Sequence, residues 1–271
     1  MRISLVVTTY ERPDALAAVL ATVAAQQRAP DEVLVADDGS GAATRAVVDR
    51  FAAHSRAPVA YIRQEHAGFR VARLRNLAIA ASRGDYLVLI DGDMLLHADF
   101  IGDHEAVARP GAFVQGMRIP LDDPGTQAAL ATPALPVRRA TPRGAGGLRR
   151  LYGLRSPLLA RTCVKLANPV VALKSCNFAL WRDDLIAVNG FNEDFVGWGP
   201  EDKEFAARLT HSGCSRRTLV FGGIAWHLHH PPASRDRRAA NEARLAATLA
   251  NRTIRCRHGL DAHPANTAAW L

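Results

Sequence analysis

The sequence has no long apolar run. No stretch of its 271 residues approaches the ~18 consecutive apolar residues that mark a membrane-spanning helix. The start, MRISLVVTTYERP, holds only a short apolar run before polar residues follow. That run is too short for a signal peptide and predicts a first strand instead. We therefore expect a protein that is soluble or bound to a membrane only at its surface.

Cysteine is scarce and scattered. The four cysteines are Cys163, Cys176, Cys214 and Cys256, and no C-x-x-C pair occurs among them. This spacing argues against a zinc site or a redox dithiol. Free thiols in a reducing cytoplasm are the favoured interpretation.

Acidic residues are missing from 124–182, which we call the basic segment, although the whole chain carries a net charge of only +8. Its basic residues include Arg138, Arg139, Arg143, Arg149, Arg150, Arg155, Arg161 and Lys165. Leucines alternate with arginines in 147–166, which suits either a solvated loop or contact with an anionic membrane or acceptor lipid. Only Tyr152 could stack on bases there, so no nucleic-acid partner is expected.

The first 120 or so residues alternate between strand and helix patterns. Short apolar runs predict strands at 3–9, 32–40, 59–63 and 85–93, with helices at 13–27, 42–53 and 70–82 between them. Nearly continuous apolar strands that alternate with helices indicate an α/β fold, whose mostly parallel, Rossmann-like sheet has helices on both faces. Ligands bind such sheets at the carboxyl ends of the strands. Those ends here carry Thr8, Asp37, Asp38, Asp91 and Asp93.

Regular patterns return after residue 170. Strands are expected at 170–181 and 223–230, and helices at 182–191, 200–213 and 234–256. Pro200 stands at a helix start, where proline is preferred, and Gly213 follows the helix end. The residues between the halves, 121–169, read as a basic insertion or a flexible lid.

Two short motifs carry potential metal ligands. Asp91 and Asp93 follow a buried strand and alternate by two, so they share a face of an extended segment. Carboxylates suit Mg²⁺ or Mn²⁺, although an acidic turn is the simpler alternative. His227 and His229 have the same spacing, and with Asp93 they would form a mixed site suited to Mn²⁺. Histidines in strands are also common as ordinary core or surface groups, and His230 adds a third candidate.

The stretch ADDGS ends the second predicted strand. A carboxylate there could accept a hydrogen bond from the N3–H of a uracil ring. Asp38 or Ser40 could equally cap the following helix.

The stretch FVGWGPEDKEF joins a tryptophan to two adjacent acids. Helix phase turns Glu201 and Asp202 toward the buried stripe, and it turns Glu204 outward to pair with Arg208 on the surface. The helix N-terminus favours ionised carboxylates, so one of the inward acids could accept a hydroxyl proton. Charge complementarity at the helix start explains any single acid, but not the paired acids beside Trp198.

These segments, in this order, resemble the GT-A glycosyltransferases of the large inverting family 2. The matching stretches are VVTTYERP, ADDGS, RNLAIAASRGDYLVLIDGDMLLHADFI and GFNEDFVGWGPEDKEFAARL. The second half is similar to the carboxyl-terminal segment of β-1,4-galactosyltransferases and chondroitin polymerases, where W-G-x-E-D precedes histidines. The resemblance covers 1–120 and 170–230. It implies a single large GT-A domain with a nucleotide-sugar-binding half at 1–120 and a smaller acceptor-binding and catalytic half at 170–271.

The resemblance also implies roles on the donor side. Thr8 and Asp38 would hold the uracil of a UDP-sugar, and Asp91 would face the ribose or the donor sugar. Arg70 or Arg73 would contact the nucleotide or diphosphate.

The remaining implied roles concern the metal and the acceptor. Asp93, His227 and His229 would bind Mn²⁺ or Mg²⁺. Trp198 and Gly199 would line the sugar pocket, Glu201 would bind the acceptor or donor sugar, and Asp202 would be the catalytic base. Pro200 replaces the glycine that is common after W-G in the family.

The expected function is metal-dependent, inverting transfer of a hexose or N-acetylhexosamine from a UDP-sugar to a glycan or glycolipid in surface polysaccharide biosynthesis. The expected location is the cytoplasm or the inner face of the cell membrane. One alternative is a degenerate relative that binds UDP or glycans without turnover, against which the retained Asp93, Asp202 and His227 argue. Another is a sugar-nucleotide pyrophosphorylase, which would need an early glycine-rich loop that TTYERP lacks.

Overall fold

A nine-stranded sheet forms the centre of the molecule, with the strand order β12-β3-β2-β1-β4-β9-β6-β10-β8. The computed structural model describes residues 1–131, 153–162, 164–165, 168, 170, 173–231, 234–264 and 269–271. The strands of this sheet are β1 (Ile3–Thr9), β2 (Glu32–Asp37), β3 (Val59–Arg63), β4 (Tyr86–Asp91), β6 (Ala112–Gln115), β8 (Val164–Lys165), β9 (Asn177–Trp181), β10 (Ser215–Thr218) and β12 (Ala269–Trp270).

Most strands of this sheet run in one direction. The pairs β3–β2, β2–β1, β1–β4 and β6–β10 are parallel. Because β9 is antiparallel to both β4 and β6, these two strands also point the same way. Only β12, β9 and β8 run in the opposite direction. The predicted mostly parallel α/β sheet is confirmed, and β9 inserts a strand from the second half of the chain into it.

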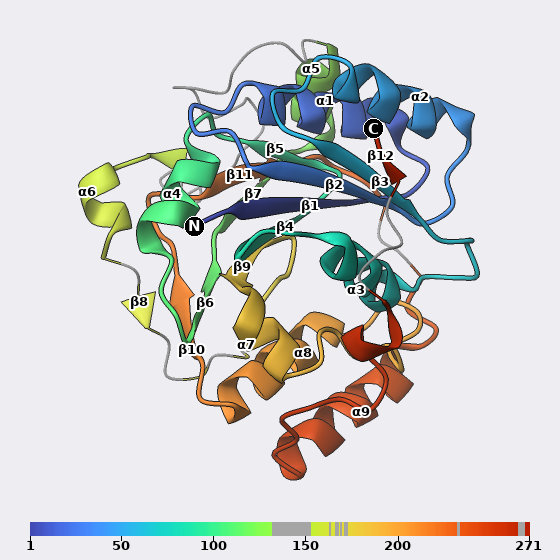
Figure 1. The fold of residues 1–271 in the computed structure, drawn as a ribbon, viewed down its shortest axis with the longest axis vertical. Coiled ribbons are helices and arrows are strands. Elements are labelled where there is room, and N and C mark those ends of the chain that lie inside the picture. The colour runs from blue at the N-terminus through green and yellow to red at the C-terminus, as the bar shows by residue number, and fades with distance from the viewer. Residues whose placement is uncertain are drawn as a thin grey trace.

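Helices cover both faces of the sheet (Figure 1). On one face lie α1 (Pro13–Ala24), α2 (Ala42–Ala52) and α5 (Asp123–Ala131), and on the other lie α3 (Val71–Ala81), α7 (Arg182–Ala187), α8 (Glu201–His211) and α9 (Arg238–Ala250). Two short helices, α4 (Phe100–Val107) and α6 (Pro157–Ala160), and the 3-10 turn η2 (Leu260–Ala262) complete the helical set of the described residues.

The apolar strands are buried on both sides. Leu5 and Val7 of β1 belong to the core under α1 and α2, whereas Val6 between them belongs to the core under α3 and α8. Burying each such side chain contributes about 1.5–3 kcal/mol relative to exposure. The continuous apolar runs thus reflect a sheet with a hydrophobic core on each face.

A second, three-stranded sheet has the order β5-β11-β7. It contains β5 (Met94–Leu96), β7 (Met117–Pro120) and β11 (Ile224–His227). The strand expected at 223–230 therefore ends at His227. The reason is that both neighbouring strands stop there, because β5 begins at Met94 and β7 ends at Pro120, and both residues lie opposite His227.

Several predicted elements are shorter in the structure than in the sequence pattern. Within the described residues, the strand expected at 170–181 forms over β9, the helix expected at 182–191 over α7, and the terminal helix expected at 234–256 over α9. The helices expected in the first half form with their ends within three residues of the prediction.

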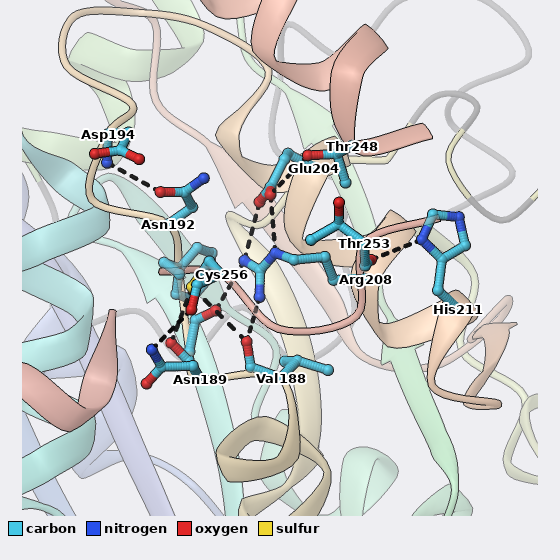
Figure 2. Close-up of polar contacts among 12 residues, drawn as sticks. Val188, Asn189, Asn192, Asp194, Glu204, Arg208, His211, Thr248, Thr253 and Cys256 are labelled. Atoms are coloured by element: carbon cyan, nitrogen blue, oxygen red, sulfur yellow. Dashed lines mark hydrogen bonds and ion pairs between the residues drawn. The ribbon is translucent and has the colours of Figure 1, made fainter. Parts of the chain in front are cut away.

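The pair Glu204–Arg208 is buried, so the prediction of a surface ion pair is wrong (Figure 2). Glu204 Oε1 accepts a hydrogen bond from Arg208 Nε at 2.8 Å, and Thr248 of α9 donates to the same oxygen at 3.1 Å. Arg208 also donates to the carbonyls of Val188 and Gly190. The physical reason is that α9 covers the face of α8 that helix phase had assigned to solvent.

Much of the basic segment lies outside the described residues, including Arg138, Arg139, Arg143, Arg149 and Arg150. Within the described part, Arg155 is an internal ion-pair partner, at 2.7 Å from Asp103 and 3.3 Å from Asp99. No helix of the described ranges is both long and apolar enough to cross a bilayer.

Three of the four cysteines lie in the described part of the chain. Cys176, Cys214 and Cys256 are buried free thiols, and Cys163 falls outside the described residues.

Candidate active site

A cleft of about 1040 Å³ opens where the parallel strands end. It is lined by the ends of β1, β2 and β4, by the start of α8 and by part of α9. The cleft brings together most of the side chains predicted from the sequence, namely Thr8, Asp38, Asp91, Asp93, Trp198, Gly199, Glu201, Asp202, His227 and His229.

Three side chains in the cleft form a group that could hold a metal ion: Asp93, His227 and His230. Asp93 Oδ2 lies 3.5 Å from His227 Nε2 and 3.4 Å from His230 Nε2. The pairing of β5 with β11 creates this proximity, because the N–H of Leu228 donates to the carbonyl of Asp93 at 2.9 Å.

This group suits a divalent cation. Asp93 Oδ1 is buried and has no hydrogen-bond partner in the described ranges. Burial and the neighbouring Asp91 raise the pKa of Asp93 to about 6. A bound cation would satisfy the orphaned oxygen and offset the cost of the buried charge. One carboxylate and two imidazoles form a donor set suited to Mn²⁺.

Two arginines flank the group. Arg118 Nη2 lies 3.1 Å from each ring nitrogen of His227, and Arg12 Nη1 lies 3.5 Å from Asp93 Oδ2. Burial, followed by the charge of Arg118, lowers the pKa of His227 to about 3. His227 is therefore neutral near pH 7, the form in which imidazole binds metals.

His229 does not join this group, contrary to the expectation that His227 and His229 point to one side. Its Nδ1 lies 3.9 Å from Asp123 Oδ1, and its side chain is 52% exposed. Because the strand ends at His227, the period of two no longer applies to the following residues. The chain instead brings His230 to Asp93.

Asp91, at the end of β4, connects neighbouring elements of the cleft. Its Oδ1 accepts hydrogen bonds from Thr8 Oγ1 at 3.0 Å and from Arg75 Nη2 at 3.1 Å. Arg75 Nη1 lies 3.5 Å from Glu201 Oε1, and the Arg75 guanidinium sits 5.1 Å from the centre of the Phe191 ring. Arg75 therefore links the end of β4 to the start of α8.

Asp38 faces the cleft rather than capping α2. The N-cap of α2 is Gly41, and the N–H of Gly41 donates to Glu11 Oε1 at 2.8 Å. Asp38 Oδ2 lies 3.0 Å from His66 Nδ1, and the amide of Gln64 donates to Asp38 Oδ1. The His66 ring stacks on Tyr10 at 4.3 Å between centroids, which forms an aromatic wall beside the carboxylate.

Arg70 and Arg73 do not line the cleft. Arg70 donates to the carbonyl of Glu65, and Arg73 donates to Gln64 Oε1 at 2.9 Å. Arg75, two residues further on, is the arginine of this helix that reaches the cleft, and it is absent from the residues predicted from the sequence. Its signal was its position on the apolar stripe of α3, four residues after Val71 and three before Ala78.

The two acids at the start of α8 both point into the cleft, as predicted. Asp202 Oδ1 accepts from the N–H of Lys203 at 2.7 Å, and Oδ2 accepts from the N–H of Ser175 at 3.4 Å. Burial raises the pKa of both acids, and in Glu201 the adjacent Asp202 adds to the rise. Burial thus opposes the helix N-terminus, which had been expected to keep both acids ionised.

Asp202 and Glu201 differ in the partners that surround their carboxylates. The two backbone N–H groups and Arg75 favour the ionised form of Asp202. A carboxylate whose pKa is raised by burial and that still has donors for its charge is a better proton acceptor than an exposed aspartate.

The glycines around Trp198 are required by close packing. A Cβ on Gly197 would meet the Arg237 side chain, and one on Gly199 would lie 2.5 Å from Asn241 Nδ2. Asn241 is buried in α9 and donates to the carbonyl of Val196 at 3.2 Å. The loop is therefore held by α9, while Trp198 remains 38% exposed at the cleft.

Two family models match the chain. The one described as Glycosyl transferase family 2 matches residues 4–152. The one described as N-terminal domain of galactosyltransferase matches residues 157–231.

Curated relatives include two types of glycosyltransferase. The chondroitin synthase of Escherichia coli is 28% identical over 246 residues, which cover 84% of this chain and 35% of that protein. Validoxylamine A glucosyltransferase of Streptomyces hygroscopicus subsp. limoneus is 31% identical over 221 residues, which cover 78% of this chain and 48% of that protein. The chain thus spans less than half the length of these relatives.

Solved structures show the same fold. S. aureus TarS in complex with UDP aligns with a TM-score of 0.63 at 16% identity, covering 97% of this chain and 68% of that chain. The mannosyltransferase PcManGT from Pyrobaculum calidifontis, in complex with GDP-Man and Mn²⁺, aligns with a TM-score of 0.62 at 19% identity, covering 92% and 64%. The expected GT-A architecture is confirmed. With the match over more than half of its length, the chain belongs to glycosyl transferase family 2 and carries a galactosyltransferase-type segment after it.

Proposed function

We propose that the protein is a metal-dependent inverting glycosyltransferase that transfers a hexose or N-acetylhexosamine from a UDP-sugar to a glycan or glycolipid acceptor in surface polysaccharide biosynthesis. The observation that carries this proposal is one cleft that joins the Asp93, His227 and His230 group to the buried carboxylate of Asp202.

The donor would lie along the strand ends. Thr8 and Asp38 would hold the nucleobase, with Tyr10 and His66 as an aromatic wall. A divalent cation bound by Asp93, His227 and His230 would supply stabilisation of the negative charge that develops on the diphosphate. Arg12 and Arg118, beside that group, would neutralise further charge on the leaving group.

The acceptor would enter between Trp198 and α8. Asp202 would take the proton of the acceptor hydroxyl, and that oxygen would attack the anomeric carbon from the face opposite the diphosphate. The new C–O bond forms as the bond to UDP breaks, and the electron pair leaves with UDP. The anomeric configuration inverts without a covalent intermediate. Glu201, tied to Arg75, would hold a sugar hydroxyl.

The choice of UDP is supported by a structural neighbour, S. aureus TarS, which has been solved in complex with UDP and with UDP-GlcNAc. The complex of a structural neighbour with GDP-Man makes the guanine nucleotide the necessary comparison. A panel of UDP-sugars and GDP-sugars with Mn²⁺ tests the proposal, with nucleotide release and the anomeric signal of the product as readouts.

The expected result is release of UDP that requires both Mn²⁺ and an acceptor, with inversion at the anomeric carbon. Binding of UDP without consumption of any donor would instead support a partner protein that binds nucleotide or glycan. Retention of configuration would overturn the role of Asp202 as the base.

The proposal keeps the donor half at 1–120, the acceptor half at 170–271 and an insertion or lid at 121–169 between them. It also includes a location at the inner face of the cell membrane, with the basic segment as the contact with anionic headgroups. The acid-free composition of the basic segment supports it. Flotation with anionic liposomes tests it, and failure to float at low salt would remove this part of the proposal.

A further inference from the structure

We propose that the residues after the family-matched segments add a subsite for an acidic group on the acceptor, a carboxylate or a phosphate. The inference rests on the proposed function and names the class of acceptor. Its residues are Arg235 and Arg238, which line the cleft although both family matches end at or before residue 231.

Arg235 stands where an acceptor sugar would contact it. Its guanidinium lies 5.0 Å from the centre of the Trp198 ring, which is 38% exposed. The guanidinium lies over this ring, so Trp198 holds it at the wall of the cleft, and an acceptor that reaches this face would meet the N–H groups of Arg235. No carboxylate lies within ion-pair distance of Arg235 in the described ranges, so its donors are available for a bidentate bond to an oxyanion.

The second arginine is partly neutralised. Arg238 Nε lies 2.7 Å from Glu242 Oε1, one turn later on α9, and both side chains are about half exposed. Lys203, beside the predicted base, also lines the cleft. Among the described residues after 231, those that line the cleft are thus two arginines, Arg235 and Arg238, and one carboxylate, Glu242.

The acids at the start of α8 have partners other than Arg235 and Arg238. Glu201 is paired with Arg75 at 3.5 Å, and Asp202 accepts two backbone N–H groups and interacts with the charges of Arg75 and Lys203. The excess positive charge is therefore at the rim beside Trp198, on the side that α9 builds. A cationic rim over an exposed aromatic ring fits an acidic sugar better than a neutral one.

The test is calorimetric binding in the presence of UDP and Mn²⁺. The probes are an oligosaccharide that ends in glucuronic acid, its carboxyl-reduced counterpart that ends in glucose, and the 6-phosphate of that counterpart. The wild-type protein should bind at least one acidic probe about tenfold more tightly than the neutral one, a difference of about 1.4 kcal/mol. The preferred acidic probe identifies the source of the oxyanion.

Three variants test which side chains produce the preference for the acidic probe. Arg235→Gln should abolish the preference for the acidic probe and leave UDP affinity unchanged. Glu242→Gln should increase the preference, because it releases Arg238 from its partner. Arg50→Gln, an equal loss of charge at an exposed site on α2, should bind all probes like the wild type.

Acidic probes that bind no better than the neutral one, while UDP binds normally, would overturn the subsite and leave the proposed function standing. An unchanged preference in Arg235→Gln would do the same. Absence of Mn²⁺-dependent UDP binding would overturn the proposed function, and the subsite with it.

Discussion

Arg75 donates to Asp91 at 3.1 Å and thereby ties α3 to the end of β4. The Arg75 side chain is only 4% exposed, and its other nitrogen lies 3.5 Å from Glu201. Removing a charge from such a buried network leaves its partners uncompensated, which costs more than the loss of a surface pair. The guanidinium thus keeps Asp91 and the start of α8, which carries Asp202, in one arrangement.

The variant Arg75→Gln is expected to lower kcat/KM by about 10–100-fold, because the loss of a charged hydrogen bond is worth about 1.5–3 kcal/mol. The kcat/KM of Arg75→Lys should lie between those of the wild type and Arg75→Gln, since lysine retains the charge but not the fork of donors. Steady-state kinetics measure the effect. Arg50→Gln is the matched control, because Arg50 is exposed on α2 and does not line the cleft. Equal losses in both variants would contradict the role of Arg75.

Asp202→Asn should lower kcat by about 10²–10⁴-fold without changing UDP affinity, because it removes proton acceptance but no predicted nucleotide contact. In the wild type, burial raises the pKa of Asp202, and the base acts only when ionised. The rate should therefore fall on acidification through a pH above the ordinary value for aspartate, about 3.9. A pH–rate profile with UDP titrations checks both statements, and near-normal turnover in the variant would remove Asp202 from the mechanism.

His230→Ala should weaken Mn²⁺ binding at least tenfold, because even residues that only support metal ligands typically contribute about 10–100-fold. His229→Ala should leave Mn²⁺ affinity unchanged, since His229 lies apart from Asp93. Titration of Mn²⁺ in the presence of UDP, followed by electron paramagnetic resonance, measures both. The opposite order of effects would restore His229 as the ligand.

Glu204→Gln should lower the free energy of unfolding by about 3–5 kcal/mol, the typical cost of breaking a buried ion pair by removing one partner. Thr248→Val, which removes only one neutral donor to Glu204, should cost about 1 kcal/mol. Denaturant unfolding of both variants gives the comparison. A loss below 1 kcal/mol in Glu204→Gln would mean that this pair is solvated in solution.

Gly199→Ala should impair turnover, because its Cβ would lie 2.5 Å from the Asn241 amide and would push the Trp198 loop away from α9. Asn241→Gly should partly rescue it by removing the obstructing side chain, at a cost of about 1 kcal/mol for glycine in a helix. Kinetics and thermal unfolding of the single and double variants measure the rescue. Additive losses would show that the clash is not the cause.

The sequence was sufficient for the sheet and for the gathering of most cleft residues, because both follow from local periodicity. Apolar strands at 3–9 and 85–93 predict buried parallel strands, and their carboxyl ends necessarily meet at one edge. The acids at 201–202 turn inward because helix phase is a local property.

The remaining details depend on tertiary contacts. The choice of His230 over His229 follows from the point where β5 stops pairing with β11, which no period within HLHH reveals. The burial of Glu204 and Arg208 follows from the cover that α9 provides, and α9 lies beyond the stretch on which the resemblance rests. Helix phase alone could have predicted Arg75 in the cleft, whereas the family motif indicates Arg70 and Arg73.

The contact of Asn241 with the Trp198 loop limits where this protein can be truncated or joined to another chain. A chain cut after residue 231 would keep both family-matched segments, yet it would lose the side chain that fills the space beside Gly199 and the hydroxyl that Thr248 contributes to Glu204. Chimeras that exchange acceptor specificity should therefore place their junction after Ala250, so that the WGPED loop travels together with its own helix.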